Sequence, residues 1–168
     1  MPDVILIAHN IRSTHNIGAL FRTAEGLGVQ KILLSGYSPH PLLGGSNNSQ
    51  KEYRLPHIAQ KLHAQIHKTA LDAESIVPFE YYETIDFTTL RQDGYVVVGL
   101  EQTPESILLP DFTAPEKIAL VLGEEVEGIP GEILKECELC VEIPMRGTKE
   151  SFNVSVAAGM ALYALFTA

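Results

Sequence analysis

Short apolar runs that alternate with helical patterns are the feature of this sequence that most limits its fold. Val4–Ala8 is the first such run, with β-branched residues at three of its five positions. Apolar residues then recur at helical spacing from Ile17 to Leu27, and Gly28 follows them directly. A continuous apolar run of this length is typical of a strand buried on both faces, and glycine is common just past a helix end. We therefore predict a strand and then a helix within the first 28 residues.

The same alternation continues to the end of the chain, which favours an α/β fold with a mostly parallel sheet flanked by helices. No internal repeat or linker interrupts it, so we expect residues 1–168 to form a single domain. A segment rich in Gly, Pro, Ser and Asn, 36–55, is expected to be a long loop that is functional or mobile. Further strands are expected at 31–35, 76–81, 95–100, 117–123 and 139–143, and further helices at 55–68, 88–92, 130–136 and 153–166.

Several classes of protein are excluded by what the sequence lacks. No apolar run approaches the roughly 18 residues that a membrane span needs, and the first residues carry no basic segment of the kind found in signal peptides. Two cysteines in 168 residues exclude a disulfide scaffold. We therefore expect a soluble, cytoplasmic protein with no membrane partner.

Charge is distributed unevenly along the chain. The formal net charge of −9 argues against a general nucleic-acid binder, since such proteins usually carry a surplus of Lys and Arg. However, residues 1–68 hold seven basic and three acidic residues, residues 69–142 hold three and seventeen, and residues 143–168 hold two and one. If the fold brings the two ends together, one face attracts a polyanion while the rest stays acidic. On charge alone, an ordinary solvated surface is the favoured interpretation.

Two segments that follow predicted strands carry polar residues or glycines suited to a site. Segment 10–24 holds Asn16 and Arg22, although a helix cap and a surface ion pair would also explain these two residues. Segment 122–130 reads Leu-Gly-Glu-Glu-Val-Glu-Gly-Ile-Pro, and its glycines allow a ligand to approach the backbone at the sheet edge where α/β proteins bind ligands. Three glutamates there would repel phosphates, so a positively charged ligand suits the segment better.

A third segment, 143–163, crowds the start of the last predicted helix with Ser151, Asn153 and Ser155. Capping explains one polar side chain at a helix start, but three are more than capping needs. The side chains and the helix N-terminus together predict a polar pocket. Small residues further along the helix predict close packing against the sheet or a second subunit.

Together the three segments resemble the SPOUT superfamily, in particular the SpoU/TrmH family of RNA ribose 2′-O-methyltransferases. The first motif is matched by Asn16 and Arg22, and the second, Gly-x-Glu-x-x-Gly, by 123–128 with its carboxylate at Glu125. The third is matched by 143–155. The matches follow the family's order over nearly the whole chain, which has the size of a minimal, TrmL-like catalytic domain.

The resemblance implies a deep C-terminal trefoil knot, a homodimer, and S-adenosylmethionine bound in a bent shape without any metal. The residues that it carries over for cofactor binding are Leu100, Gly123, Ile143, Met145 and Ser151. The residues that it carries over for catalysis are Asn16, Arg22, Glu125, Ser151 and Asn153.

The implied reaction is in-line attack of a ribose 2′-oxygen on the sulfonium methyl, in which most of the acceleration comes from positioning. Arg22 is often cast as the base in the family, but arginine stays protonated in proteins. Binding the adjacent phosphate with its fork, and so orienting the hydroxyl, is the alternative role. A tRNA is favoured over an rRNA as the substrate. Phosphate contacts are expected from Arg12, Lys51, Arg54, Arg146 and Lys149.

Other interpretations stay open at this point. One is a knotted RNA-binding protein that has lost methyl transfer, and another is a nucleotide-binding regulatory module, which the missing phosphate loop disfavours. Cys137 and Cys140 form a lone C-x-x-C, and His63 and His67 could complete a four-ligand zinc site with them. Two ordinary reduced cysteines are the favoured interpretation of that motif.

Overall fold

Seven strands form one sheet in the computed structural model, which describes residues 1–167. They are β1 (Asp3–His9), β2 (Lys31–Ser35), β3 (Phe79–Tyr82), β4 (Val96–Leu100), β5 (Ile107–Leu108), β6 (Lys117–Leu122) and β7 (Leu139–Glu142). Their order across the sheet is β3-β2-β1-β6-β4-β7-β5. Every pair of neighbouring strands is parallel, which confirms the predicted α/β sheet. The strand order does not by itself define how the chain threads, so the trefoil knot stays a prediction.

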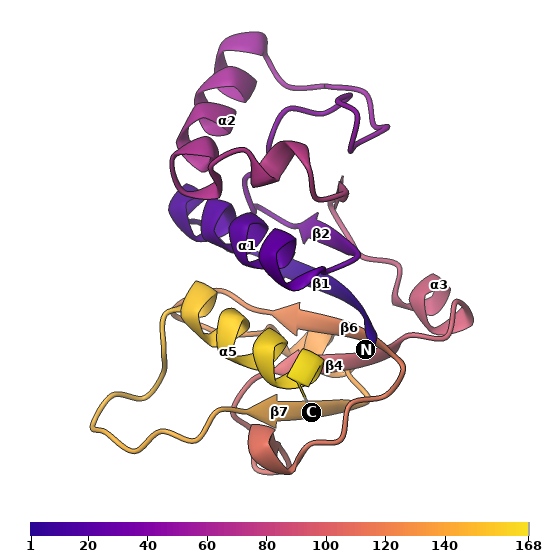
Figure 1. Cartoon of the computed structure of the whole chain (residues 1–168), viewed down its shortest axis with the longest axis vertical. Helices are drawn as coiled ribbons and strands as arrows, with labels where there is room; N and C mark the ends of the chain where they lie inside the picture. Colours follow the sequence, from indigo (N-terminus) through magenta and orange to yellow (C-terminus); the bar gives the residue numbers. More distant parts are fainter. Residues whose placement is uncertain (168) are drawn as a thin grey trace.

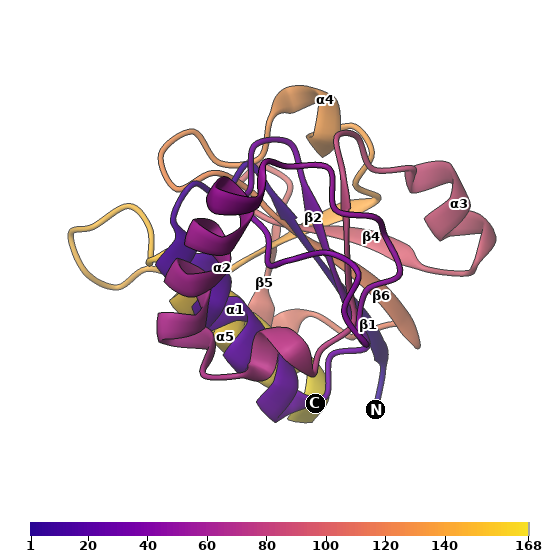
Figure 2. The same ribbon diagram turned by 90° about the horizontal axis from the view of Figure 1, so that it is seen from above.

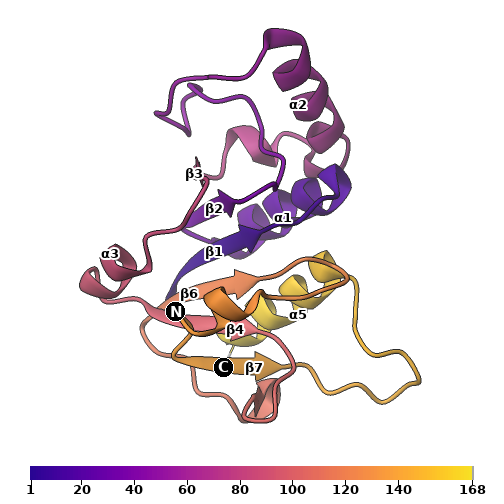
Figure 3. The same ribbon diagram turned by 180° about the vertical axis from the view of Figure 1, so that it is seen from behind.

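Helices cover both faces of this sheet (Figure 2). On one face lie α1 (Thr14–Leu27), α2 (Pro56–Ala70) and α5 (Val154–Thr167), and on the other lie α3 (Phe87–Gln92) and α4 (Gly131–Leu134). The first and last of these helices, α1 and α5, lie side by side although they come from opposite ends of the sequence (Figures 1 and 3). The first and last helices are therefore adjacent, but α5 holds no charged residue, so positive charge on one face stays a prediction.

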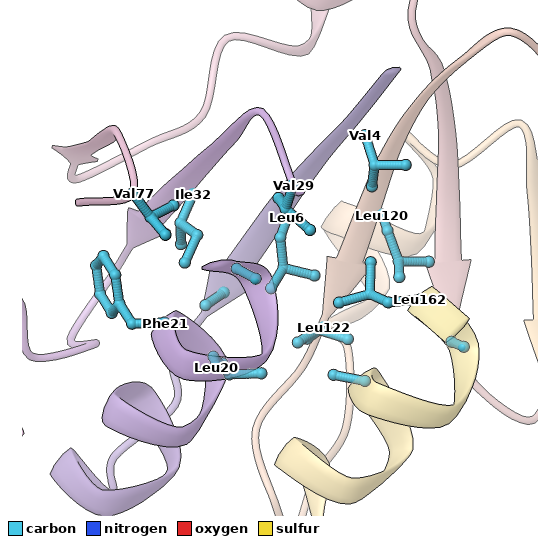
Figure 4. Close-up of a cluster of buried hydrophobic side chains, with 14 of the residues drawn as sticks. Val4, Leu6, Leu20, Phe21, Val29, Ile32, Val77, Leu120, Leu122 and Leu162 are labelled. Carbon is cyan, nitrogen blue, oxygen red and sulfur yellow. The ribbon is translucent and has the colours of Figure 1, made fainter. Parts of the chain in front are cut away.

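The unbroken apolar run in β1 is explained by the helices on both faces. Val4 and Leu6 point into the larger core cluster, which α1 and α5 cover (Figure 4). Ile5 and Ile7 belong to a second cluster, beneath α3 and α4. Successive side chains of a strand point to opposite faces, so a strand covered on both sides is apolar at every position.

The start of α1 differs from one expectation. Ser13 caps the helix, since its Oγ accepts a hydrogen bond from the Asn16 backbone N–H at 3.2 Å. The interpretation of Asn16 as the cap is therefore wrong, and its side chain is available for other contacts. Gly18 sets the distance to α2, because a Cβ at this position would lie 2.1 Å from Oγ1 of Thr69.

Segment 36–55 forms the long predicted loop and covers the outer edge of β3. Amide side chains of the loop take the place of a further strand: Gln50 accepts from the backbone N–H of Tyr81 at 2.7 Å and donates to its carbonyl at 2.7 Å. Asn48 donates to the Phe79 carbonyl at 2.8 Å in the same way. Polar groups on a sheet edge need such partners, so the loop is bound firmly to the fold rather than attached only at its ends.

Short elements account for most differences from the predicted boundaries. The strand expected at 76–81 is β3 at Phe79–Tyr82, since a 3-10 helix, η1 (Ala73–Ser75), occupies the chain just before it. The helix expected at 130–136 is only α4 at Gly131–Leu134. Two residues of β5 and the 3-10 helix η2 (Leu109–Asp111) were not expected, because elements this short have no periodicity. Among residues 1–167, no helix is long and apolar enough to span a bilayer.

Candidate active site

A cavity of about 260 Å³ opens where β4, β6 and β7 end. Parallel α/β sheets place ligands at this edge, beyond the carboxyl ends of the strands. All the residues predicted to bind the cofactor line the cavity, although they come from four separate stretches of the sequence: Leu100, Gly123, Ile143, Met145 and Ser151. The structure thus brings the five together, and their binding of a cofactor stays a prediction.

Glycines at both ends of segment 123–128 allow it to fold back on itself. Glu124 and Gly128 exchange backbone hydrogen bonds of 3.1 and 2.9 Å. A Cβ on Gly123 would lie 2.3 Å from the carbonyl carbon of Gly128, so only glycine fits. Gly128 itself has a φ of 73°, in the left-handed region that favours glycine. The two glycines of the predicted motif are therefore required by the backbone of a tight turn at the cavity wall.

Glu101 supports this turn and was missed by the sequence analysis. Its Oε2 accepts a hydrogen bond from the Ile129 backbone N–H at 2.9 Å. A Cβ on Gly128 would lie 2.2 Å from the same oxygen. Its neighbour Gln102 also lines the cavity and donates to the Glu150 carbonyl at 2.9 Å. Both residues directly follow β4, and that position was the available signal.

A directional chain of side-chain hydrogen bonds links all three predicted motifs. Oδ1 of Asn153 accepts from the backbone N–H of Ser155 at 2.9 Å, at the start of α5, so its Nδ2 is left to donate. It donates to Oδ1 of Asn16 at 3.2 Å. Nδ2 of Asn16 then donates to Oε1 of Glu125 at 3.2 Å. The bond from Ser155 fixes the orientation of the Asn153 amide, and the bond from Asn153 fixes that of Asn16. The start of α5 therefore determines that Asn16 turns its NH2 group to the carboxylate of Glu125.

Carboxylates dominate the polar lining of the cavity. Arg12 is the one basic side chain that pairs with any of them among the described residues, with its Nε 3.8 Å from Glu124. Apolar side chains such as Leu100 and Ile143 line the rest of the wall. A cavity with this lining suits a cationic ligand that also has an apolar part. The acidic side chains are Glu101, Glu124, Glu125, Glu127, Glu142 and Glu150.

Arg22 lies apart from the other predicted catalytic residues. It is exposed on α1, does not line the cavity, and makes no ion pair within residues 1–167. Six residues separate it from Asn16, which corresponds to about 9 Å along a helix axis. Its neighbours Ala19 and Thr23 line a shallow hollow between α1 and α5.

The predicted RNA contacts fall into two groups. Arg146 and Lys149 are exposed on the segment between β7 and α5, which extends away from the sheet (Figure 1). Lys51 in the long loop and Arg12 beside the cavity are also exposed. Arg54 differs, because its guanidinium lies within the loop.

The Arg54 guanidinium uses four of its five N–H donors within its own loop. It donates to both carboxylate oxygens of Glu52 at 2.8 Å and to the carbonyls of His40 and Pro41 at 2.9 and 2.8 Å. This bidentate pair lowers the pKa of Glu52 to about 2. The geometry gives Arg54 a structural role and no support for the predicted phosphate contact.

The two cysteines and two histidines that could together form a zinc site lie at opposite ends of the molecule. Cys137 and Cys140 are free thiols at β7, whereas His63 and His67 lie on α2 (Figures 1 and 3). These four side chains therefore do not form one site. Burial raises the pKa of Cys137 to about 12, so the thiol stays protonated at neutral pH.

Comparison with known proteins gives one family. The model of the SpoU rRNA Methylase family matches residues 47–163. A 23S rRNA (guanosine-2′-O-)-methyltransferase, RlmB, from Neisseria meningitidis is 32% identical over 163 residues, which are 96% of this chain and 57% of that protein. The chain thus spans about half the length of the curated relative.

Solved structures of similar proteins support the same fold. The SpoU methyltransferase AviRb from Streptomyces viridochromogenes, solved in complex with the cofactor AdoMet, has a TM-score of 0.77 and 20% identity, covering 98% of this chain and 57% of its own. A structure described as giving insights into 2-OH methylation of C/U34 on tRNA has a TM-score of 0.71 and 22% identity, covering 98% of this chain and 95% of its own.

Proposed function

The chain belongs to the SpoU rRNA methylase family, and from this we propose that it transfers the methyl group of S-adenosylmethionine to a ribose 2′-hydroxyl in RNA. The observation that carries the proposal is that side chains from three separate motifs are hydrogen-bonded to one another beside one cavity, which residues of the second and third motifs line. Asn153, Asn16 and Glu125 come from three distant segments and are joined by two hydrogen bonds of 3.2 Å. Capping of α5 explains the polar side chain of Asn153, but it does not explain the bonds that link it to Asn16 and Glu125.

The residues around the cavity fit this cofactor. When bound, S-adenosylmethionine supplies an electrophilic methyl group on a positively charged sulfur. The acidic wall suits that charge, and the apolar side chains of Leu100, Ile143 and Met145 suit a flat aromatic base. Loss of the methyl group leaves a neutral sulfur, so the same wall favours substrate over product. Asn16 and Asn153 position the turn that carries Glu125, and Arg22 orients the ribose through its phosphate.

A homodimer through α1 and α5 is part of this proposal. The hollow between these helices is lined by small and apolar residues, and Val156, Met160 and Tyr163 on α5 are 51%, 39% and 62% exposed. Large apolar side chains gathered on one face are typical of a protein–protein contact. Arg22 follows Ala19 by one turn of α1, so a second copy seated on this face would lie beside its guanidinium.

RNA is the proposed substrate, with tRNA favoured over rRNA. The exposed side chains of Arg12, Lys51, Arg146 and Lys149 supply positive charge for phosphates. The similar structure whose chain this protein covers almost entirely concerns tRNA, whereas the Neisseria meningitidis relative acts on 23S rRNA and is much longer.

Two measurements test the proposal. We expect calorimetry to show S-adenosylmethionine binding to the purified chain, with S-adenosylhomocysteine bound more weakly. The tRNA and the rRNA of a strain that lacks the protein are then incubated separately with the purified chain and S-adenosylmethionine. Nucleoside mass spectrometry should detect a new 2′-O-methylated nucleoside in the tRNA. Methylation of rRNA alone would overturn the choice of tRNA. Binding of RNA without methylation of either RNA would favour the knotted RNA-binding protein instead.

A further inference from the structure

A cluster of titratable side chains outside the cavity lies where α2 ends and η1 begins. Nδ1 of His67, in the last turn of α2, lies 2.6 Å from Oε1 of Glu74 and 3.7 Å from Oδ1 of Asp72. The ligating atoms of these three residues all lie within 4.8 Å of one another. The turn between them passes through Leu71 and Asp72 at φ values of 50° and 75°, which residues other than glycine rarely adopt.

Glu74 is the member of the cluster that the fold alone does not explain. Its side chain is 1% exposed, and its Oε2 is buried with no hydrogen-bond partner in the described part of the chain. A carboxylate oxygen in that position has lost its water without compensation, which is unfavourable. The other oxygen of this carboxylate, Oε1, lies 2.6 Å from Nδ1 of His67, so a cation held there would neutralise the buried carboxylate, and would compensate Oε2 directly if both oxygens bind it.

We propose that His67, Asp72 and Glu74 bind a divalent transition-metal ion, with Zn²⁺ the foremost candidate. One imidazole and two carboxylates are donors that Zn²⁺ accepts at about 2.0–2.2 Å, and water completes a tetrahedral site with three protein ligands. Ligand atoms at those bond lengths are roughly 3.3 Å apart. The two separations from His67, 2.6 and 3.7 Å, bracket that value, and all three ligand atoms lie within 4.8 Å of one another, so side-chain movements of about 1 Å would bring them to it. The ion displaces a proton from Nδ1 of His67.

His63 is close to the cluster but is not a ligand. Its Nδ1 accepts a hydrogen bond from the Leu42 backbone N–H at 3.1 Å. A neutral imidazole then carries its hydrogen on Nε2, and that atom faces Oε1 of Glu74 at 4.0 Å. The ring therefore presents a hydrogen to the carboxylate, not a lone pair to the metal.

The site would tie α2 to the long loop. Leu42 belongs to that loop, and Asn47 of the same loop donates to the Glu74 backbone carbonyl at 2.7 Å. Since Lys51 lies in this loop as well, metal binding would stiffen a surface that we expect RNA to contact. The inference itself does not depend on methyl transfer and is tested without it.

Metal binding is measured on the full chain, freed of any affinity tag, by calorimetric titration with Zn²⁺ and by thermal unfolding. The test variants are His67→Gln and Asp72→Asn, whose side chains are 47% and 80% exposed in the native protein, so both should fold. His57→Gln, at another exposed histidine of α2, is the matched control. We expect one Zn²⁺ per chain and a rise in Tm of about 5–10 °C at 100 times the Kd. Each test variant should weaken binding at least about tenfold, and the control should leave it unchanged.

Titration with Co²⁺ separates this site from the two thiols. Ligation by nitrogen and oxygen gives weak visible bands, whereas ligation by Cys137 and Cys140 adds an intense ultraviolet thiolate band. We expect the weak bands alone at one equivalent. No Zn²⁺ binding by the native chain, unchanged affinity in both test variants, or a thiolate band at one equivalent would each overturn the proposal.

Discussion

The hydrogen bond from Asn16 to Glu125 predicts a measurable energetic coupling between two residues that are 109 positions apart. Asn16→Asp replaces the donating amide by a carboxylate of nearly the same shape, at 3.2 Å from the carboxylate of Glu125. Two unit charges at that distance repel by about 1.3 kcal/mol in water, the appropriate medium for this exposed pair. The lost hydrogen bond adds about 1 kcal/mol. The expected coupling is therefore about 2 kcal/mol.

A double-mutant cycle isolates this coupling from other effects of the substitution. An aspartate in the first turn of α1, which holds no acidic residue in the native chain, gains about 0.3–1 kcal/mol from the helix dipole. The stability of Asn16→Asp alone therefore understates the repulsion. In the double variant Asn16→Asp, Glu125→Gln, the glutamine can donate to the new aspartate, so the bond is restored with reversed direction. Urea unfolding of the native chain, both single variants and the double variant gives the coupling free energy.

The control cycle pairs Asn16→Asp with Glu127→Gln, because Glu127 lies in the same turn and has no side-chain bond to Asn16 in the described structure. Its coupling should stay below about 0.5 kcal/mol. High salt should reduce the coupling with Glu125 toward the hydrogen-bond part alone, since it screens exposed charges. A coupling near zero at positions 16 and 125 in low salt would refute the hydrogen-bonded chain.

Three further predictions address the loop, the turn and the arginine. Burial lowers the pKa of His40 to about 4, so between pH 6.5 and pH 4 the unfolded chain binds a proton at this residue that the folded chain does not. The free energy of unfolding therefore falls as the pH is lowered through this range. Urea unfolding at pH 8 and pH 5 should show the native chain losing about 2 kcal/mol more than His40→Gln; equal losses would contradict this. Gly128→Ala should weaken S-adenosylmethionine binding at least about tenfold, while Gly131→Ala, where an added Cβ meets no atom within 4 Å, leaves calorimetric affinity unchanged. Arg22→Ala should lower methyl transfer about 100-fold with cofactor affinity intact, and near-normal turnover would show that Arg22 is not needed.

The sequence was most informative where burial determines residue type. Val4–Ala8 is apolar at every position because helices cover both sides of β1, so strand and layer could be predicted together. Gly123 and Gly128 were identifiable because their positions admit no side chain. In these cases a single physical requirement, either burial or a lack of space for a side chain, determines the residue type, and the neighbouring sequence shows it.

Residues whose role depends on distant partners could not be predicted. Ser13 and Asn16 are both good helix caps, and only the position of Glu125 shows that Ser13 caps while Asn16 turns toward the cavity. Arg54 resembles an RNA contact in the sequence, yet Glu52 and two carbonyls occupy it. Glu101 carries no motif signal, because its role is to hold a turn that begins 22 residues later.

The position of Arg22 outside the cavity leads to a last prediction, about the proposed homodimer. Asn16 is bonded to Glu125 in the cavity wall, whereas Arg22 lies about 9 Å further along α1, next to residues that line the hollow between α1 and α5. We therefore propose that Arg22 serves the cavity of the second copy. Mixing Arg22→Ala chains with Gly128→Ala chains tests this at an S-adenosylmethionine concentration that fills the unaltered cavity but not the Gly128→Ala cavity, because each variant alone then has little activity. In a mixed dimer the Gly128→Ala chain supplies its arginine to the intact cavity of the other chain. Random pairing should restore about a quarter of the native methyl-transfer rate. If Arg22 acts within its own chain, mixing restores nothing, and α1 would have to bend or turn for the arginine to reach the cavity.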